Sequence, residues 1–249
     1  MIIQIIGLPG AGKTALSEAL ADRINAIHWN ADKVRATLNS DLGFTKEDRL
    51  EQSRRMGCLA RLTSEQDYIV IADFVCPTDE TREAFGKPDI LIWVDRIDAS
   101  RFEDTNKMWK DPNKFDLVIK DCLTVEEEVD LVINTFNLYD WKKPTTLLLG
   151  RYQPWHEGHY ALYNEALTRT GQNVIGVRHT QGTSEKDPMI FTDVKKNIAK
   201  FRDNAFVVKF PNITNIVYGR DVGYKIEQVE LSKELQDISA TKKRKEMGL

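Results

Sequence analysis

The stretch that decides the fold is "GLPGAGKT", residues 7–14. It fits the pattern G-x-x-x-x-G-K-[ST] in full, and it lies between an apolar run at 1–6 and a segment with helical periodicity. Glycines at Gly7, Gly10 and Gly12 allow the backbone to wrap a polyphosphate, while amides at the start of the helix point at the anion. We therefore predict an ATP-binding loop with Lys13 at the β- and γ-phosphates and Thr14 at Mg²⁺.

Apolar runs alternate with helical segments on the C-terminal side of this loop. Together with the run before the loop, they predict strands at 2–7, 26–29, 68–75, 90–95 and 115–119, and helices at 14–24, 31–38, 46–62, 79–85 and 124–136. Strands that read as continuous apolar runs are typical of parallel sheets that helices cover on both faces. The fold class predicted for this part of the chain is therefore α/β.

The pattern restarts after the polar segment "NLYDWKKPTT", residues 137–146. Further strands are expected at 146–151, 173–179, 205–210 and 212–219, and helices at 156–171 and 193–201 before a polar helical tail. We place a boundary near 138–144 and predict two α/β domains with parallel sheets, at 1–140 and 144–249.

The bulk composition narrows the class of protein. With 249 residues, 41% hydrophobic and 29% charged, and a net charge of −3, the chain lacks the basic excess expected for nucleic-acid or anionic-membrane binding. The apolar run "MIIQIIG" is too short to span a bilayer. Three cysteines without C-x-x-C spacing argue against a metal site or a disulfide framework. We expect a cytoplasmic enzyme with small-molecule and nucleotide partners, and leave open whether it forms a homo-oligomer.

Residues that follow the second predicted strand indicate an acceptor site. Asp32 lies just past that strand's carboxyl end, where ligands bind in open α/β sheets, so it could bind an acceptor hydroxyl or take its proton. Arg35 and Arg49 lie close in sequence, as an anionic substrate requires. For the neighbouring Arg54 and Arg55, a solvated helix face is an equal alternative.

These segments, "NADKVR" (30–35), "LNSDLGFTKEDRLEQ" (38–52) and "FVCP" (74–77), resemble the adenylylsulfate (APS) kinase family. That family carries D-G-D-x-x-R, then L-N-x-D-L-G-F-x-x-x-D-R-x-E-N, then F-I-S-P. The resemblance covers roughly residues 1–140 and implies a P-loop kinase fold. It implies that Asp32 is the acidic residue of the acceptor site. It also implies a substrate site of two phosphosulfate-binding arginines, an adenine-packing aromatic and the residue at the family's Asn position, namely Arg35, Arg49, Phe44 and Gln52.

The departures from the family pattern broaden the prediction. Asn30 and Ala31 replace its first Asp and Gly, and Asp73 stands where a small residue is usual. Asp73 either holds a Mg²⁺-bound water or caps a turn as a strand-end carboxylate. The family's lid is replaced by residues 101–116, with Arg101, Lys107 and Lys110 as candidate lid cations, and no second adenine-stacking aromatic is evident. We therefore predict phosphoryl transfer to a hydroxyl of a small anionic molecule, APS or a related metabolite.

A second candidate site is "GRYQPWHEGH", residues 150–159, which holds two of the four histidines. An H-x-x-H pair supplies too few ligands for a metal site, and a packed or surface pair is the alternative. Together with the distal "ISATKKRKE" (238–246), however, the stretch resembles the nucleotidyltransferase superfamily, and is closest to nicotinamide-nucleotide adenylyltransferases, which read G-R-F-Q-P-x-H-x-G-H. The resemblance covers about 145–245 and implies a Rossmann-like fold.

The resemblance also implies a reaction. A substrate phosphate attacks the α-phosphorus of ATP or CTP and pyrophosphate leaves, so the protein's task is positioning and charge neutralisation. His156 and His159 are then expected to stabilise the transition state. The NTP-binding set that the resemblance implies is Gly150, Arg151, His156, His159, Ser239, Thr241 and Arg244, with Arg244 also counted as catalytic.

Taken together, the two motifs predict a bifunctional enzyme, a kinase joined to a nucleotidyltransferase. One alternative is a sulfate-activating pair, in which a compact sulfurylase-type domain accompanies an APS kinase. The other alternative is that one domain acts only as a nucleotide-binding module.

Overall fold

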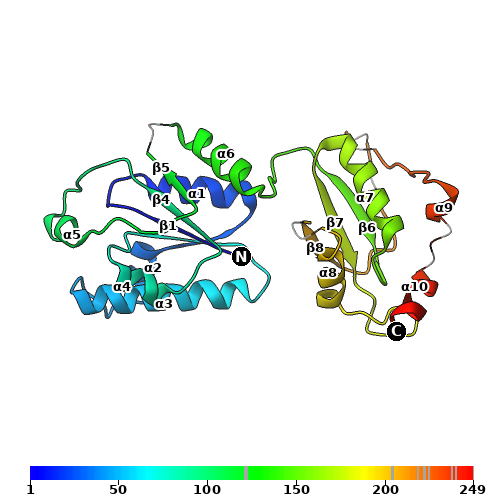
Figure 1. The fold of residues 1–249 in the computed structure, drawn as a ribbon, viewed down its shortest axis with the longest axis horizontal. Helices are drawn as coiled ribbons and strands as arrows, with labels where there is room; N and C mark the ends of the chain where they lie inside the picture. The colour runs from blue at the N-terminus through cyan, green and yellow to red at the C-terminus, as the bar shows by residue number, and fades with distance from the viewer. Residues whose placement is uncertain are drawn as a thin grey trace. The chain divides into compact units, whose positions relative to one another are not determined.

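The computed structural model describes residues 1–120, 123–202, 205–217, 219–220, 223, 225–236, 238 and 240–248. The chain divides into two compact units, Met1–Lys142 and Lys143–Leu249 (Figure 1). Each unit is an α/β structure built on a parallel sheet, as the alternating pattern predicts. No helix among the described residues is long and apolar enough to cross a membrane.

The first unit is built on a five-stranded parallel sheet with the strand order β2-β3-β1-β4-β5. Its strands are β1 (Ile2–Ile6), β2 (Ile27–Asn30), β3 (Val70–Phe74), β4 (Ile90–Val94) and β5 (Leu117–Ile119). The central strand β1 is buried along its whole length, because helices cover both faces of the sheet. Parallel pairing brings the carboxyl ends of β1, β2 and β3 to one edge, where the phosphate-binding loop begins.

Helices α1 (Lys13–Ile24) and α6 (Val125–Phe136) cover one face of this sheet, and α2 (Ala31–Thr37), α3 (Lys46–Ser64) and α4 (Asp79–Phe85) cover the other (Figure 1). Leu16, Leu20 and Val132 are fully buried in the first layer, and Met56 and Ala60 in the second. Threonine capping boxes begin α3, α4 and α6. The short helix α5 (Glu103–Met108) follows β4.

The second unit has a three-stranded parallel sheet in the order β6-β7-β8, made of β6 (Thr146–Gly150), β7 (Asn173–Arg178) and β8 (Val207–Phe210). Its helices are α7 (Glu157–Thr170), α8 (Phe191–Ala199), α9 (Lys233–Gln236) and α10 (Ala240–Met247) (Figure 1). Ile175 and Val194 are fully buried between sheet and helices. Tyr152 and Trp155, from the loop between β6 and α7, join the same core.

Two predicted features differ from the structure. The predicted strand at 212–219 does not form in its described part, where residues 211–217 have no regular secondary structure. Its β-branched residues favour a strand, but Ile216 and Val217 are 58% and 85% exposed, so the burial that stabilises a strand is missing. Helix α5 was not predicted: residues 101–116 were described only as the replacement of the family's lid, with no helix assigned.

Candidate functional site

The loop between β1 and α1 has the backbone that its glycines predict. Gly7, Gly10 and Gly12 have φ angles of +151°, +89° and +97°. A Cβ at Gly7 would lie 2.3 Å from the carbonyl oxygen of Val94, and one at Gly12 would lie 2.7 Å from Nη1 of Arg96. Gly12 is the N-cap of α1, and no side chain caps the helix there. The first-turn amides of α1 are therefore available to an anion.

Lys13 is buried at the start of α1, and its Nζ donates a hydrogen bond of 2.9 Å to the carbonyl oxygen of Leu8 within the loop. Burial lowers the pKa of Lys13 to about 8, against the opposing attraction of Asp73 and Asp32. The ammonium is therefore mostly protonated at neutral pH, and it is held beside the loop that would receive a polyphosphate.

Thr14 is part of a polar network on the floor of the site. Its Oγ1 donates to Oδ2 of Asp73 at 2.7 Å, and Nε2 of His28 lies 2.6 Å from Oδ1 of the same carboxylate. Nδ2 of Asn30 donates to both oxygens of Asp73 at 3.1 and 3.2 Å. Burial alone raises the pKa of Asp73, but these hydrogen bonds outweigh it, and the pKa lies below its ordinary value.

An ionised carboxylate beside a threonine hydroxyl is a donor set that suits Mg²⁺, a hard cation that prefers oxygen. The described residues include no group of three or more His, Cys, Asp or Glu side chains able to hold a metal by themselves. Thr14 and Asp73 therefore fit Mg²⁺ that arrives with the phosphates of a nucleotide, and they do not form an all-protein cage.

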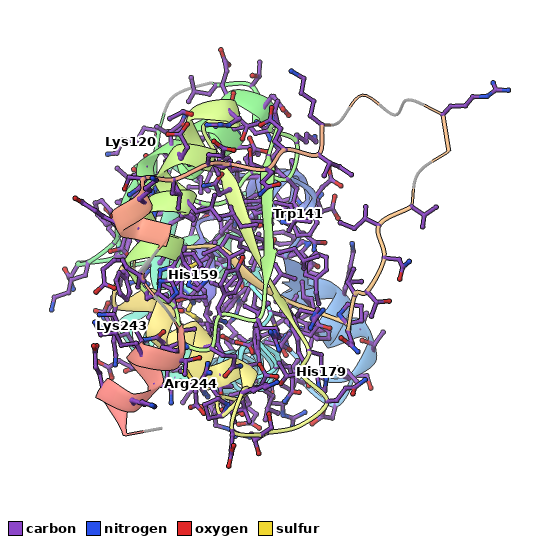
Figure 2. The ribbon with its side chains drawn as sticks, turned by 90° about the vertical axis from the view of Figure 1, so that its right-hand side faces the viewer. Lys120, Trp141, His159, His179, Lys243 and Arg244 are labelled. Carbon is purple, nitrogen blue, oxygen red and sulfur yellow. The ribbon has the colours of Figure 1, made fainter. Side chains whose placement is uncertain are left out.

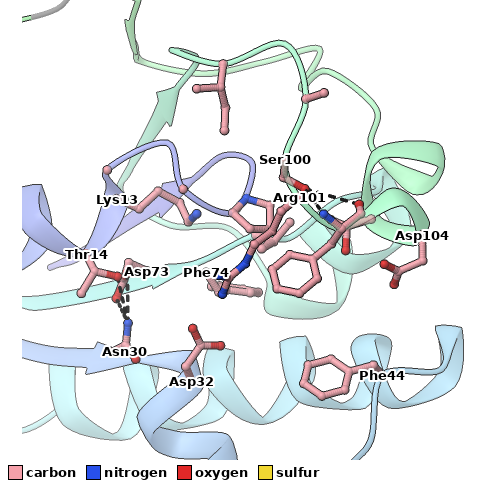
Figure 3. A pocket seen from close by; sticks show the side chains of 18 of the residues that line it. Lys13, Thr14, Asn30, Asp32, Phe44, Asp73, Phe74, Ser100, Arg101 and Asp104 are labelled. Carbon is pink, nitrogen blue, oxygen red and sulfur yellow. Dashed lines mark hydrogen bonds between the residues drawn. The ribbon is translucent and has the colours of Figure 1, made fainter.

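One cleft of about 970 Å³ joins the loop to the predicted acceptor side (Figure 3). Asp32 and Phe44 face it from α2 and from the segment before α3, and Arg101 faces it from the β4–α5 connection. The cleft brings together eight predicted site residues: Gly10, Gly12, Lys13, Thr14, Asp32, Phe44, Arg49 and Asp73. Gly7, Arg35 and Gln52 are not among its lining residues.

Arg35 and Arg49 both pack over the Phe44 ring, with guanidinium carbons 4.8 and 5.7 Å from its centroid. Arg35 donates to the carbonyl oxygen of Gly43, and Arg49 Nε donates to that of Phe44 at 3.0 Å. Arg49 Nη2 also forms an ion pair of 2.6 Å with Asp104 of α5. The two arginines therefore support an aromatic ring that is 66% exposed.

Gln52 has a different position from the one the resemblance implies. Its side chain is buried, donates to the carbonyl oxygen of Ala31 at 3.1 Å and accepts from Asn39 Nδ2 at 2.8 Å. The amide therefore ties α3 to the start of α2 and does not face the cleft. Arg54 and Arg55 pair with Glu51 on the exposed face of α3, which agrees with the solvated-face alternative.

Sequence reasoning missed several residues of this site. His28 contacts Asp73, and Phe102 and Asp104 line the cleft, although no motif marks these three residues. Phe74, the first residue of the segment "FVCP", also lines the cleft, although no role was predicted for it. The one available signal was the acidic pair after Phe102, which is typical of a helix start. Of the predicted lid cations, Arg101 lines the cleft, whereas Lys107 is exposed and pairs with Glu103 at 3.7 Å.

In the second unit, His156 is the N-cap of α7, and its Nδ1 accepts from the amide of Gly158 at 3.2 Å. His159 stacks on it, with ring centroids 3.9 Å apart. Burial lowers the pKa of His156, and burial together with the neighbouring His156 lowers the pKa of His159 to about 3. Both rings are therefore neutral at pH 7. Nδ1 of His159 is buried without a hydrogen-bond partner among the described residues.

The loop that carries these histidines is fixed to the segment at the start of α8. Gln153 exchanges two hydrogen bonds of 2.8 Å with the backbone of Met189, and the amide of Trp155 donates to Asn197. At Gly150, a Cβ would lie 2.8 Å from the Tyr152 ring, so a larger residue there would require that ring to shift. Arg151 forms an ion pair of 3.2 Å with Asp187.

Helix α10 brings the distal motif to the same loop. Arg244 Nη1 donates to the carbonyl oxygen of Gln153 at 2.7 Å, and its Nη2 donates to Thr241 at 3.0 Å. Lys243 pairs with Glu157 at 3.4 Å, within the first turn of α7. Figure 2 labels His159, Lys243 and Arg244 in this unit. Ser239, the remaining predicted phosphate ligand, lies outside the described residues.

Comparisons with known proteins bear on the first unit. The family described as adenylylsulphate kinase matches residues 1–88. The adenylyl-sulfate kinase of Paraburkholderia xenovorans is 32% identical over 161 residues, which cover 53% of this chain and 90% of that enzyme. The adenylyl-sulfate kinase of Bacillus licheniformis is 43% identical over 86 residues, 32% of this chain and 44% of that enzyme.

Among solved structures, the APS kinase of Mycobacterium tuberculosis in complex with AMPPNP and APS aligns with a TM-score of 0.48 and 20% identity, covering 55% of this chain and 96% of that one. The chain spans less than half the length of the Bacillus relative but nearly all of the Paraburkholderia enzyme. On the strength of that long match and of the family match over residues 1–88, which include the phosphate-binding loop, the chain belongs to the adenylyl-sulfate kinase family.

Proposed function

We propose that the first unit transfers the γ-phosphoryl group of ATP to a hydroxyl of adenylyl sulfate or a closely related anionic metabolite. The observation that carries this proposal is the single cleft that joins the P-loop residues Lys13 and Thr14 to Asp32 and Phe44. A phosphoryl donor and an acceptor that share one cleft can meet in line, and positioning supplies most of the catalysis in such reactions.

Each residue of the site has a separate role in the proposed transfer. The acceptor hydroxyl attacks the γ-phosphorus, the bond from that phosphorus to the bridging oxygen of ADP breaks, and Asp32 takes the hydroxyl proton. Lys13 and the first-turn amides of α1 neutralise the phosphate charge. Mg²⁺, held by Thr14 and Asp73 with the nucleotide, would spread the charge on the β- and γ-oxygens.

Phe44 and Phe102 support an aromatic acceptor. Both rings line the cleft, and they are 66% and 43% exposed. Phe102 supplies the second aromatic that the sequence pattern did not show. Two exposed rings beside one cleft offer faces on which a base can stack, and this favours a nucleotide such as adenylyl sulfate over a sugar.

The test is ADP formation from ATP with adenylyl sulfate, nucleosides, mononucleotides and sugars as acceptors. We expect turnover with a nucleotide-like acceptor and a loss of at least 100-fold in kcat for Asp32→Asn. Asp22→Asn, an exposed carboxylate at the far end of α1, is the matched control and should retain activity. Equal activity of Asp32→Asn and the wild type, or turnover with sugars only, contradicts the proposal.

For the second unit, we propose nucleotidyl transfer from ATP or CTP to a phosphate, with release of pyrophosphate. The observation that favours it is the stacked, neutral pair His156 and His159 beside Arg244 of α10. Neutral imidazoles can donate hydrogen bonds to a triphosphate, and a guanidinium can hold the departing pyrophosphate. No covalent intermediate on the protein is required.

Pyrophosphate release is the measurement for this unit. We expect release from ATP or CTP that depends on a mononucleotide such as NMN and is lost in His159→Ala. Release that molybdate stimulates without a mononucleotide would instead identify a sulfurylase. The absence of release under either condition would leave this unit as a nucleotide-binding module.

A further inference from the structure

The side chain of His28 contacts the carboxylate of Asp73 and has no role in the phosphoryl transfer proposed above. Strand β2 pairs with β3 so that Asn30 is opposite Asp73, and His28, two residues earlier, projects from the same face of the strand. The His28 side chain is 12% exposed, and that of Asp73 is 1% exposed. The 2.6 Å contact between Nε2 and Oδ1 is therefore shielded from water.

The direction of this hydrogen bond follows from the state of the carboxylate. An ionised carboxylate can only accept, so Nε2 of His28 carries the proton and donates. Oδ1 of Asp73 then accepts from His28 and Asn30, and Oδ2 accepts from Thr14 and Asn30. Donors from three side chains fix the carboxylate plane.

The same network orients Thr14. The Thr14 hydroxyl proton points to Asp73, and Oγ1 accepts from Asn30 Nδ2 at 3.2 Å, so one lone pair of Oγ1 remains to ligate a cation. If His28 were lost, Asp73 would keep only Thr14 and Asn30 as partners, and its carboxylate could rotate. The orientation of Thr14 would then be fixed less tightly.

We propose that His28 is a positioning residue of the kinase, which holds Asp73 and, through it, Thr14 in the arrangement that receives a magnesium–nucleotide complex. This inference rests on the proposed kinase function of the first unit. Residues that orient metal-binding groups from behind commonly change metal affinity 10- to 100-fold when they are replaced.

The experiment is a calorimetric titration of the full chain with ADP, once with excess Mg²⁺ and once with EDTA. The ratio of the two affinities is the magnesium-dependent gain. His28→Gln retains an N–H donor near the position of Nε2, whereas His28→Met has a similar length and no donor. We expect His28→Met to reduce the magnesium-dependent gain about 10-fold, and His28→Gln to retain most of it.

Two controls separate positioning from a loss of folding. Trp29→Phe removes the 3.1 Å hydrogen bond from Trp29 to Thr63 on the other face of β2, and it should leave the gain unchanged. Asp73→Asn should lose the gain. The proposal is overturned if His28→Met keeps the wild-type gain, if its affinity falls equally with Mg²⁺ and with EDTA, or if the wild type shows no gain. ADP binding needs no acceptor, so failure to find a phosphoryl acceptor does not affect this test.

Discussion

Lys13 shows at the scale of one residue how burial tunes a binding group. Its pKa lies near 8, so the free protein loses the ammonium charge as the pH rises through that value. We expect the affinity for a non-hydrolysable ATP analogue to fall between pH 7 and 9. Lys13→Ala should bind the analogue more weakly and with little pH dependence over the same range. A wild-type affinity that is flat to pH 9 would contradict this account of Lys13.

His159 is a second residue at which burial opposes protonation, here of an imidazole. Its pKa is about 3 in the folded chain, against about 6.5 in an unfolded one, so the unfolded state binds the proton first as the pH falls. The contribution of His159 to the unfolding free energy of the second unit is therefore fully present above pH 6.5. It declines below that pH, by about 2 kcal/mol at pH 5.

The measurement is hydrogen exchange of the buried β7 amides at pH 5.0 and 7.5, corrected for intrinsic rates. His159→Phe keeps an aromatic ring at the stack but cannot titrate, so it should lose less stability than the wild type between the two pH values. Equal losses in the two proteins would show that His159 is not the source of the acid sensitivity.

At the scale of the element, α5 closes one side of the acceptor cleft through Asp104. This carboxylate is 62% exposed and pairs with Arg49, the residue expected to meet the acceptor's anionic group. An anionic acceptor must therefore compete with Asp104. Because a partly exposed ion pair contributes up to about 1 kcal/mol, Asp104→Asn should lower the acceptor KM by up to about 5-fold.

The matched control is Glu103→Gln on the same turn of α5, whose partner is Lys107 and not a cleft arginine. Steady-state kinetics with acceptor and ATP varied separately should show the change in the acceptor KM alone. A higher acceptor KM in Asp104→Asn would mean that the pair builds the site and does not compete for it.

Elements were predictable where periodicity and burial agree. The continuous apolar strands β1, β3 and β4 and the capped helices α3, α4 and α6 lie within a few residues of their predicted ranges. Helix α5 was missed because six residues are too short for a periodic pattern. The segment at 212–219 was predicted as a strand because its composition favours one, although in its described part no sheet partner buries it.

The site was predictable where a motif fixes the backbone. It was less predictable where strand pairing and helix packing determine which side chains are in contact. Gly7, Gly12 and Lys13 follow from the loop pattern alone. A Cβ at Gly7 would lie 2.3 Å from a backbone carbonyl oxygen, and Gly12 has a positive φ. Gln52 was expected at the substrate but ties α3 to α2, whereas His28, which no motif marks, contacts Asp73. The register of β2 on β3 and the packing of α3 on α2 decide both contacts. The spacing of these residues in the sequence does not reveal the register of β2 on β3.

At the scale of the whole molecule, the two proposed phosphate sites lie one in each compact unit. Lys13 and His159 lie in separate compact units, each with its own hydrophobic core, so a change at one should leave the packing around the other intact. We expect Lys13→Ala to lower phosphoryl transfer by at least 100-fold and, when a phosphate acceptor is supplied, to leave pyrophosphate release unchanged. His159→Ala should have the reverse effect.

Both activities can be followed in one reaction that contains ATP labelled at the γ-phosphate and a hydroxyl acceptor. If the steps are consecutive, the label first enters the acceptor and then appears in a product capped by a nucleotide. Lys13→Ala should form neither product, and His159→Ala should accumulate the phosphorylated acceptor. An equal mixture of the two variants should restore the capped product, because the first product diffuses from one protein to the other. Turnover that survives either substitution would show that the corresponding unit binds nucleotide without transforming it.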